Sequence, residues 1–187
     1  MRWADDFMKP LQTLLGLFIA GFLAYGIGVY GFTQFLPAVE AEFHWGRAML
    51  GGTMSAFWLA APFVFISRML LDRIGLRGVL VVGAACEATA LGLMAFLTSP
   101  FEMYLLRFLM GIGKVLIVTP IPIALARTFH ARTGLALAVA LAGWHVGGIV
   151  MAPVSTRACT VIDFNSGLLG LLSSISVLII PMGSSLL

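Results

Sequence analysis

The sequence predicts an all-α membrane protein built as a bundle of six transmembrane helices. Its composition is the first reason: 60% of the 187 residues are hydrophobic and only 10% are charged, and the mean hydropathy of +1.05 lies far above that of soluble domains. The second reason is a series of uncharged apolar runs of about 20 residues, the length that an α-helix needs to cross a bilayer. The third is Arg68–Arg77, where three arginines and an aspartate separate two such runs, as in a short cytoplasmic loop.

The apolar runs and the breaks between them place the six helices along the chain. We expect helices at residues 11–36, 48–71, 78–98, 103–126, 135–154 and 167–187. Pro37 and the charged stretch from Glu40 to Arg47 are expected to form a polar turn, and Ser99 and Pro100 a tight turn before the fourth helix. The last run has no charge to anchor it at its end. Residues 1–154 are therefore expected to form a bundle of five helices, and residues 155–187 an atypical tail that carries the sixth.

The basic residues are distributed unevenly between the two ends of this predicted bundle. One end holds seven of the eleven lysines and arginines, namely Arg2, Lys9, Arg68, Arg73, Arg77, Arg127 and Arg132. The opposite end keeps only Arg47 and Arg157. Cytoplasmic loops carry an excess of basic residues. The bias predicts a multi-pass protein of the plasma (inner) membrane with its N-terminus in the cytoplasm.

Several other classes of protein find no support in the sequence. The formal net charge is +3, but no basic stripe interleaved with aromatic residues indicates a nucleic-acid partner. Cys86 and Cys159 match no metal-binding or redox spacing, so we expect no metal and no cofactor. Glu87 is the only carboxylate at membrane depth, and no paired acidic or Ser/Lys constellation shares a helix face, so an enzyme is not expected. The expected partners are the lipid bilayer and a small-molecule solute.

Ionisable residues at membrane depth are the first candidates for a solute site. Lys114 lies near the middle of the fourth helix and Glu87 near the middle of the third, although a basic residue there costs about 2.5–3.5 kcal/mol on insertion scales. We expect the two side chains either to form a charge pair that only neutralises both groups, or to compete for a proton or an anionic substrate. Arg107 precedes Lys114 by seven residues, which places both on one helix face about 10.5 Å apart. A face with two cations suits a carboxylate.

Aromatic residues and glycines within the helices offer weaker signals. Tyr25 on the first helix and His145, next to Trp144 on the fifth, are further candidates for lining a solute site. Tyr25 could instead belong to the interfacial aromatic belt, and a lone histidine in a helix often serves only in packing. Gly143 and Gly147 are four residues apart, so one face of the fifth helix can approach a partner helix closely.

Three motifs resemble those of one family. Residues Asp72–Arg77 read D-R-x-G-x-R, and residues Arg107–Gly113 read R-x-x-x-G-x-G on the fourth helix. Gly143, Gly147 and Pro153 form a looser glycine–proline motif on the fifth helix. In this order the motifs resemble those of the major facilitator superfamily of secondary transporters. The segments E-F-H-W-G-R-A before the second helix and T-F-H-A-R-T-G-L before the fifth resemble the monocarboxylate-porter and oxalate/formate-antiporter branch, which implies carriage of small organic anions.

The resemblance implies particular roles for these residues. Asp72, Arg73, Gly75 and Arg77 match the signature loop between helices two and three, and we expect it to hold one side of the bundle closed by ion pairs; the alternative is that its arginines only fix the topology. Arg68 stands where the family usually has glycine. The fourth helix lines the solute cavity in this family, which favours Lys114, Arg107, Tyr25 and His145 as substrate-binding residues.

The family also implies one half of a two-half fold, because its solute is held between two six-helix halves. We therefore expect a missing second half, in a longer or truncated gene product, or a homodimer partner. The alternative is a non-transporting remnant or an accessory membrane subunit.

Overall fold

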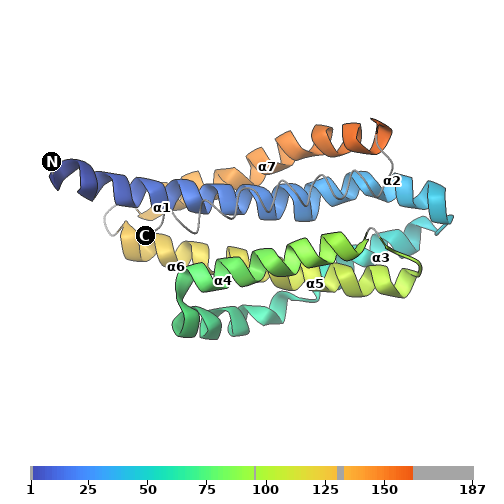
Figure 1. The fold of residues 1–187 in the computed structure, drawn as a ribbon, viewed down its shortest axis with the longest axis horizontal. Helices are drawn as coiled ribbons and strands as arrows, with labels where there is room; N and C mark the ends of the chain where they lie inside the picture. Colours follow the sequence, from blue (N-terminus) through green and yellow to red (C-terminus); the bar gives the residue numbers. More distant parts are fainter. Residues whose placement is uncertain (1, 95, 130–132, 162–187) are drawn as a thin grey trace.

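The computed structural model describes residues 2–94, 96–129 and 133–161, and this part of the chain is helical without strands. Four continuous helical stretches in it are long and apolar enough to cross a membrane: Leu11–Ala41, Arg47–Met94, Pro100–Thr128 and Thr133–Pro153. The helices lie roughly parallel to one long axis (Figure 1). The predicted all-α membrane bundle is therefore confirmed. The sixth predicted helix, at 167–187, lies outside the described residues.

The first long helix consists of α1 (Arg2–Tyr25), a π-helical segment η1 (Gly26–Gly31) and α2 (Phe32–Phe43). The predicted turn at Pro37 is wrong, because α2 continues through this proline to Phe43. Helix α2 continues because Leu36, Val39 and Phe43 fall on one face and pack into the hydrophobic core. The helix ends at His44, which adopts the left-handed conformation (φ 54°) and so turns the chain back.

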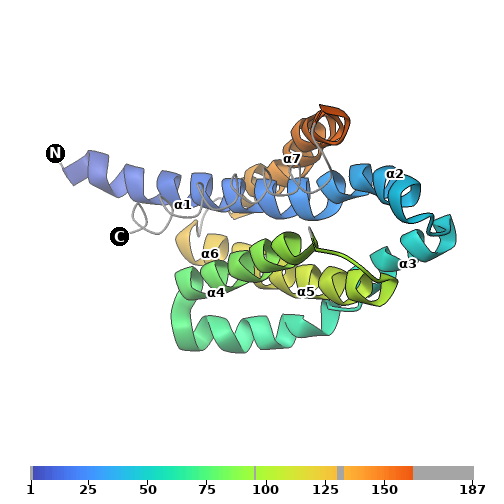
Figure 2. The same ribbon diagram turned by 45° about the vertical axis from the view of Figure 1, so that its right-hand side comes forward.

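The second stretch reverses direction at a single glycine. It consists of α3 (Arg47–Trp58), a short 3-10 turn η2 (Ala61–Phe63) and α4 (Val64–Met94). Gly75 has φ 73° and ψ 174° inside α4, a conformation essentially restricted to glycine. The two parts of α4 run in opposite directions on either side of it (Figure 2). The Arg47–Met94 stretch, which has 48 residues, therefore supplies two antiparallel rods of membrane-crossing length, as predicted for residues 48–71 and 78–98.

The remaining helices are α5 (Pro100–Val118), α6 (Pro120–Thr128) and α7 (Thr133–Val161). Helix α5 begins with a capping box, in which the Ser99 hydroxyl accepts a hydrogen bond from the Glu102 amide and the Glu102 carboxylate accepts one from the Ser99 amide. Pro120 separates α5 from α6 while the chain direction is kept. Helix α7 continues to Val161.

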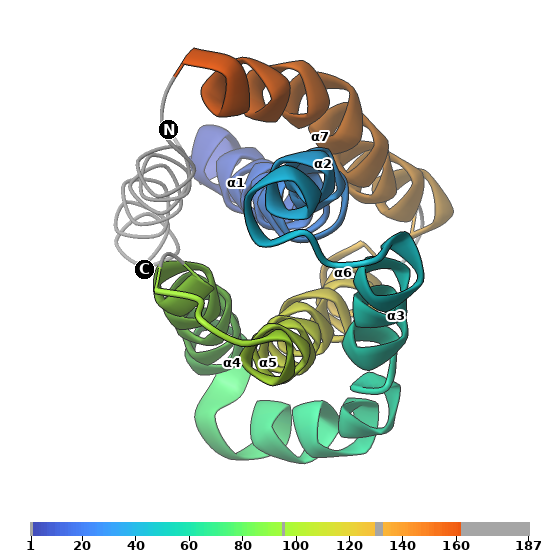
Figure 3. The same cartoon turned by 90° about the vertical axis from the view of Figure 1, so that its right-hand side faces the viewer.

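Viewed end-on, α1, α2 and α7 gather on one side of the bundle and α3, α4 and α5 on the other (Figure 3). Glycines permit the closest contacts between α1 and α7. A Cβ atom added at Gly143 would lie 2.6 Å from the carbonyl oxygen of Phe18, and one at Gly147 would lie 3.2 Å from the amide nitrogen of Gly26. The predicted packing face of the fifth membrane helix is thus confirmed.

The burial pattern differs from that of a soluble protein, because apolar side chains cover the outside of the bundle as well as filling its core. Large apolar side chains such as Phe65, Phe96 and Ile149 are at least 74% exposed, whereas Arg107 is fully buried. An exposed surface this apolar requires an apolar medium, which agrees with a bilayer around the bundle.

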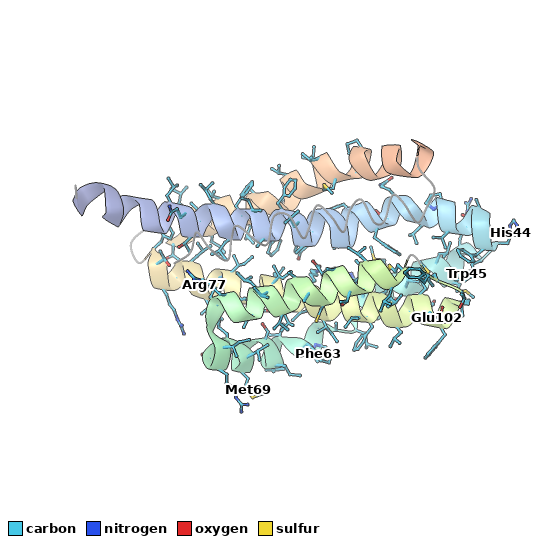
Figure 4. All side chains as sticks on the ribbon, viewed as in Figure 1. His44, Trp45, Phe63, Met69, Arg77 and Glu102 are labelled. Atoms are coloured by element: carbon cyan, nitrogen blue, oxygen red, sulfur yellow. The ribbon has the colours of Figure 1, made fainter. Side chains whose placement is uncertain are left out.

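The two ends of the bundle carry the predicted sets of connections. The start of α1, the reversal at Gly75 and the end of α6 lie together at one end, and the α2–α3 and α4–α5 connections lie at the other. Arg77 lies at the first end, and His44 and Glu102 lie at the second (Figure 4). This arrangement confirms the predicted grouping of the loops; which end faces the cytoplasm remains a prediction.

Candidate functional site

Helix α5 carries the two basic residues that the sequence singles out, and both point into the bundle. Its buried positions include Met103, Arg107, Met110, Lys114 and Ile117, a spacing of three and four residues that describes one helical face. Arg107 is 0% exposed and Lys114 is 4% exposed. The prediction that they share one inward face is confirmed.

Arg107 is anchored to the first long helix. Its Nη1 donates a hydrogen bond to the carbonyl oxygen of Gly28 at 2.9 Å. Gly28 belongs to the π-helical segment η1, and such segments occur frequently at functional sites because they interrupt the regular ladder of backbone hydrogen bonds. The guanidinium also lies 3.9 Å from the ring centre of Phe32 and 4.6 Å from that of Phe57, a cation–π arrangement. Its Nε has no hydrogen-bond partner among the described residues.

Lys114 sits among aromatic rings. Its Nζ lies 3.6 Å from the ring centre of Trp58, 4.4 Å from that of Tyr25 and 5.1 Å from that of Phe57. We call these three rings the ammonium cage. Within the described structure, Nζ has no hydrogen-bond partner. The ring faces attract the ammonium electrostatically but leave its three N–H donors without acceptors.

Glu87 on α4 completes the group, and we refer to Glu87, Arg107 and Lys114 as the buried charge cluster. Glu87 is 3% exposed, and its carboxyl group lies within range of electrostatic interaction with Lys114 and Arg107. The position of its carboxyl group follows from close packing of α4 on α5. A Cβ atom added at Gly113 would lie 2.9 Å from the Glu87 Cγ, and one added at Gly28 would lie 3.0 Å from the Glu87 Oε1.

The predicted charge pair between Glu87 and Lys114 is absent from this structure. The one ion pair found among the described residues joins Arg47 to Glu40 at the bundle surface. Glu87 Oε1 and Lys114 Nζ are both buried and lack hydrogen-bond partners among the described residues. The pair does not form because the ammonium cage holds Nζ against α1 and α3, whereas Glu87 lies beside Gly28 and Gly113. The structure therefore contains three buried ionisable side chains with no direct ion pair between them.

The two remaining candidates for a solute site, Tyr25 and His145, lie in different surroundings in the structure. Tyr25 belongs to the ammonium cage and stacks on Trp144 of α7, with ring centres 4.3 Å apart and planes at 11°. His145, the next residue along α7, is exposed on the outside of the described bundle. The structure thus brings Tyr25 to Lys114 but leaves His145 away from the buried charge cluster, since neighbouring positions of a helix point about 100° apart.

Sequence reasoning missed Phe32, Phe57 and Trp58 as neighbours of the two cations. Their aromatic character alone does not mark them, because an aromatic residue in a membrane helix can face lipid as readily as the interior. One usable signal is that Phe57 and Trp58 precede a break in the helix at Ala61–Phe63, where Pro62 stands.

The signature loop lies at the end of the bundle, without the expected ion pairs. Asp72 and Arg73 are exposed, and no ion pair of Asp72, Arg73 or Arg77 is found among the described residues. Asp72 and Arg77 lie on opposite sides of the reversal at Gly75, where Asp72 is exposed and Arg77 is half-buried. The positive φ of Gly75 explains why glycine is needed in this loop.

The described residues contain no group of three histidine, cysteine, aspartate or glutamate side chains that could hold a metal ion. The described side chains of the site offer two basic groups, one carboxyl group and a set of aromatic faces. Such a set can bind an anion, retain a proton at Glu87, or exchange one for the other.

Comparison with known proteins agrees with this geometry. Residues 14–186 match the Major Facilitator Superfamily. The chain is 29% identical to monocarboxylate transporter 13 of Rattus norvegicus over 183 residues, which cover 94% of this chain and 41% of the relative. It is 26% identical to the riboflavin transporter MCH5 of Saccharomyces cerevisiae over 140 residues, or 71% of this chain and 27% of the relative. The chain thus spans less than half the length of these curated relatives. With its helical bundle and its three motifs in order, the chain belongs to the Major Facilitator Superfamily, a family of membrane transporters.

Proposed function

We propose that this chain is a secondary transporter of a small organic anion, such as a monocarboxylate, or the N-terminal half of such a transporter. The observation that carries the proposal is the buried charge cluster, in which two cations face one carboxyl group with no direct ion pair. Placing a charge at membrane depth costs free energy unless a partner compensates it. A carboxylate substrate would compensate the excess positive charge.

Arg107 and Lys114 offer complementary ways to hold such a substrate. A guanidinium can bind a carboxylate through two parallel hydrogen bonds, and an ammonium acts as a compact point charge with three donors. The ammonium cage adds apolar faces for the carbon skeleton of an organic anion. The rat relative is named a monocarboxylate transporter, which supports this substrate class, whereas the name of the yeast relative shows that sequences of this similarity also carry other solutes.

Glu87 is the candidate for coupling transport to protons. Its carboxyl group lies in the same electrostatic field as both cations, so substrate binding and protonation of Glu87 influence each other. A protonated Glu87 leaves more net positive charge for the anion, and an ionised Glu87 opposes it. We infer that the anion and a proton enter the site together.

A second half would complete the transporter. Secondary transporters of this type hold solute near the midplane between two repeats that rock against each other. The chain spans 41% of the rat relative, so we propose that a second six-helix half, or a second copy of this chain, closes the site. The signature loop Asp72–Arg77 would gate one side during this motion.

We also propose that the N-terminus and the Gly75 reversal face the cytoplasm of a cell whose plasma (inner) membrane holds the protein. The concentration of arginines at this end supports the orientation. Cysteine introduced by R73C, in a background lacking Cys86 and Cys159, should resist labelling by an impermeant maleimide in intact cells and react after permeabilisation. Labelling in intact cells would reverse the orientation.

Uptake into proteoliposomes tests the substrate class. The complete gene product should accumulate radiolabelled lactate or pyruvate when the lumen is alkaline. Lys114→Ala should reduce initial uptake at least tenfold, since a hydrogen bond to a charged group contributes about 1.5–3 kcal/mol, and Lys114→Arg should restore part of it. The matched control is Arg47→Gln, which removes an exposed cation outside the cluster and should leave uptake unchanged.

The Glu87→Gln variant tests whether binding of the anion can be separated from the coupling of its transport to protons. This variant should still exchange external for internal anion but should lose its response to a pH gradient. If Lys114→Ala and Glu87→Gln both transport at the wild-type rate, the site assignment is wrong. If folded protein moves none of the carboxylates, the proposed substrate class is wrong, and uptake of other solutes then distinguishes a different carrier from a non-transporting member of the family.

A further inference from the structure

A second charged region lies at the bundle end that carries the Gly75 reversal. There α1, the turn of α4 and the end of α6 line a partly open cavity of about 510 Å³. Two arginines line it, Arg77 from α4 and Arg127 from the last turn of α6. These residues are 50 positions apart in the sequence, and only the fold brings them to one cavity. Figure 4 shows Arg77 at this end, well away from the middle of the bundle.

The positive charge of this cavity is not neutralised by the protein that is described. Neither Arg77 nor Arg127 has an ion pair or a hydrogen bond among the described residues. None of the described residues that line the cavity is acidic, although the exposed Asp72 lies only five positions before Arg77. Two arginines that line one cavity, with no carboxylate in its described lining, are expected to attract an anion.

The walls of the same cavity are largely apolar. They include Leu71 and Ile74 from α4 and Ile123 from α6, and the hydroxyl-bearing Thr128 also lines the cavity. A small soluble anion gains nothing from such walls, whereas a lipid gains from them along its glycerol and acyl portions. The cavity lies at the reversal inside α4 and at the end of α6, a level expected for the boundary between hydrocarbon and headgroups.

We propose that Arg77 and Arg127 form a phosphate-binding site at this end of the bundle, and that its occupant is the headgroup phosphate of an anionic phospholipid. The bound lipid would contact both the α4 reversal and the end of α6, and so stabilise the packing of these two elements at this end of the bundle. The site is separate from the buried charge cluster. The proposal is therefore independent of the identity of the solute and of whether the chain transports a solute.

The alternative is that the two arginines only contribute to topology, as basic residues in cytoplasmic loops generally do. Arg73 provides the matched control for this alternative. It belongs to the same loop and is exposed, but it does not line the cavity. A topological role predicts equal effects for Arg73 and Arg77, and a binding site predicts that only Arg77 and Arg127 matter.

The test uses the purified full chain in a mild detergent. Native mass spectrometry should count bound phosphatidylglycerol, and thermal unfolding should report stabilisation by added phosphatidylglycerol, phosphatidylcholine or inorganic phosphate. The wild type should retain phosphatidylglycerol and be stabilised by it more than by phosphatidylcholine. R77Q and R127Q should each weaken apparent binding about tenfold, as expected for the loss of a charge-assisted contact, whereas R73Q should bind as the wild type does.

Three results would overturn the proposal. Equal stabilisation by phosphatidylcholine would show that the cavity does not select an anionic headgroup. Equal weakening by R73Q would show that net charge of the loop is sufficient. Stabilisation by inorganic phosphate with none from phosphatidylglycerol would assign the site to a soluble anion. R77K provides a check on folding, since it keeps the charge and should retain more lipid than R77Q.

Discussion

The close contact between α4 and α5 at Gly113 can be tested with one added methyl group. Gly113→Ala places a Cβ atom 2.7 Å from the carbonyl oxygen of Gly83 and 2.9 Å from both the amide nitrogen and the Cγ of Glu87. Ordinary contacts of this kind begin at about 3.4 Å. Two of the three atoms belong to the backbone of α4, so no change of side-chain rotamer can relieve the overlap.

The expected cost follows from this geometry. The two helices must separate by roughly half an ångström or more over a well-packed contact, and overpacking of this kind costs about 1–3 kcal/mol. Alanine is intrinsically favoured over glycine in a helix by up to about 1 kcal/mol, which offsets part of the cost. We expect a net loss of about 1–2 kcal/mol in the free energy of unfolding. Because the Cγ of Glu87 must also move, anion uptake should fall as well.

The measurement is unfolding in mixed micelles with increasing denaturing detergent, followed by circular dichroism. Gly51→Ala is the matched control, because Gly51 also lies within a helix and a Cβ atom there would meet nothing within 4 Å. This control should be unchanged or up to about 1 kcal/mol more stable. If Gly113→Ala proves as stable as Gly51→Ala, the close approach of α4 and α5 is wrong, and with it the described position of Glu87.

Three further substitutions test other parts of the fold by the same unfolding measurement. Gly75→Ala forces a side chain into the positive-φ conformation of the α4 reversal and should destabilise the protein by about 1–3 kcal/mol; a neutral result would show that the reversal does not depend on this backbone conformation. Gly143→Ala should destabilise the α1–α7 contact, where its Cβ atom would lie 2.6 Å from a backbone carbonyl oxygen, by about 1–3 kcal/mol, whereas Gly134→Ala on the same helix, with open space around it, should not. Ser99→Ala removes one half of the capping box with Glu102 and should cost about 1 kcal/mol; no loss would show that Glu102 alone caps α5.

Much of the architecture could be predicted because membrane helices are encoded locally. The lengths of the apolar runs and the positions of the charges between them depend only on neighbouring residues and on the thickness of the bilayer. That Arg107 and Lys114 share one helix face also follows from helical spacing alone. The continuation of α2 through Pro37 was not predicted, because Leu36 and Val39 favour the helix through tertiary contacts that a local pattern does not contain.

What the sequence by itself determined, then, is a membrane bundle of the Major Facilitator Superfamily with two buried cations on one helix. Only the tertiary structure decided that Tyr25 and Trp58 surround Lys114, that Glu87 stays apart from it, that His145 faces outward, and that Arg77 meets Arg127 in one cavity. The physical reason is that a helix in lipid is apolar on its outer as well as its inner face. Hydrophobic periodicity therefore does not determine how such a helix is rotated about its own axis. Close helix–helix contacts at glycines such as Gly113 determine it.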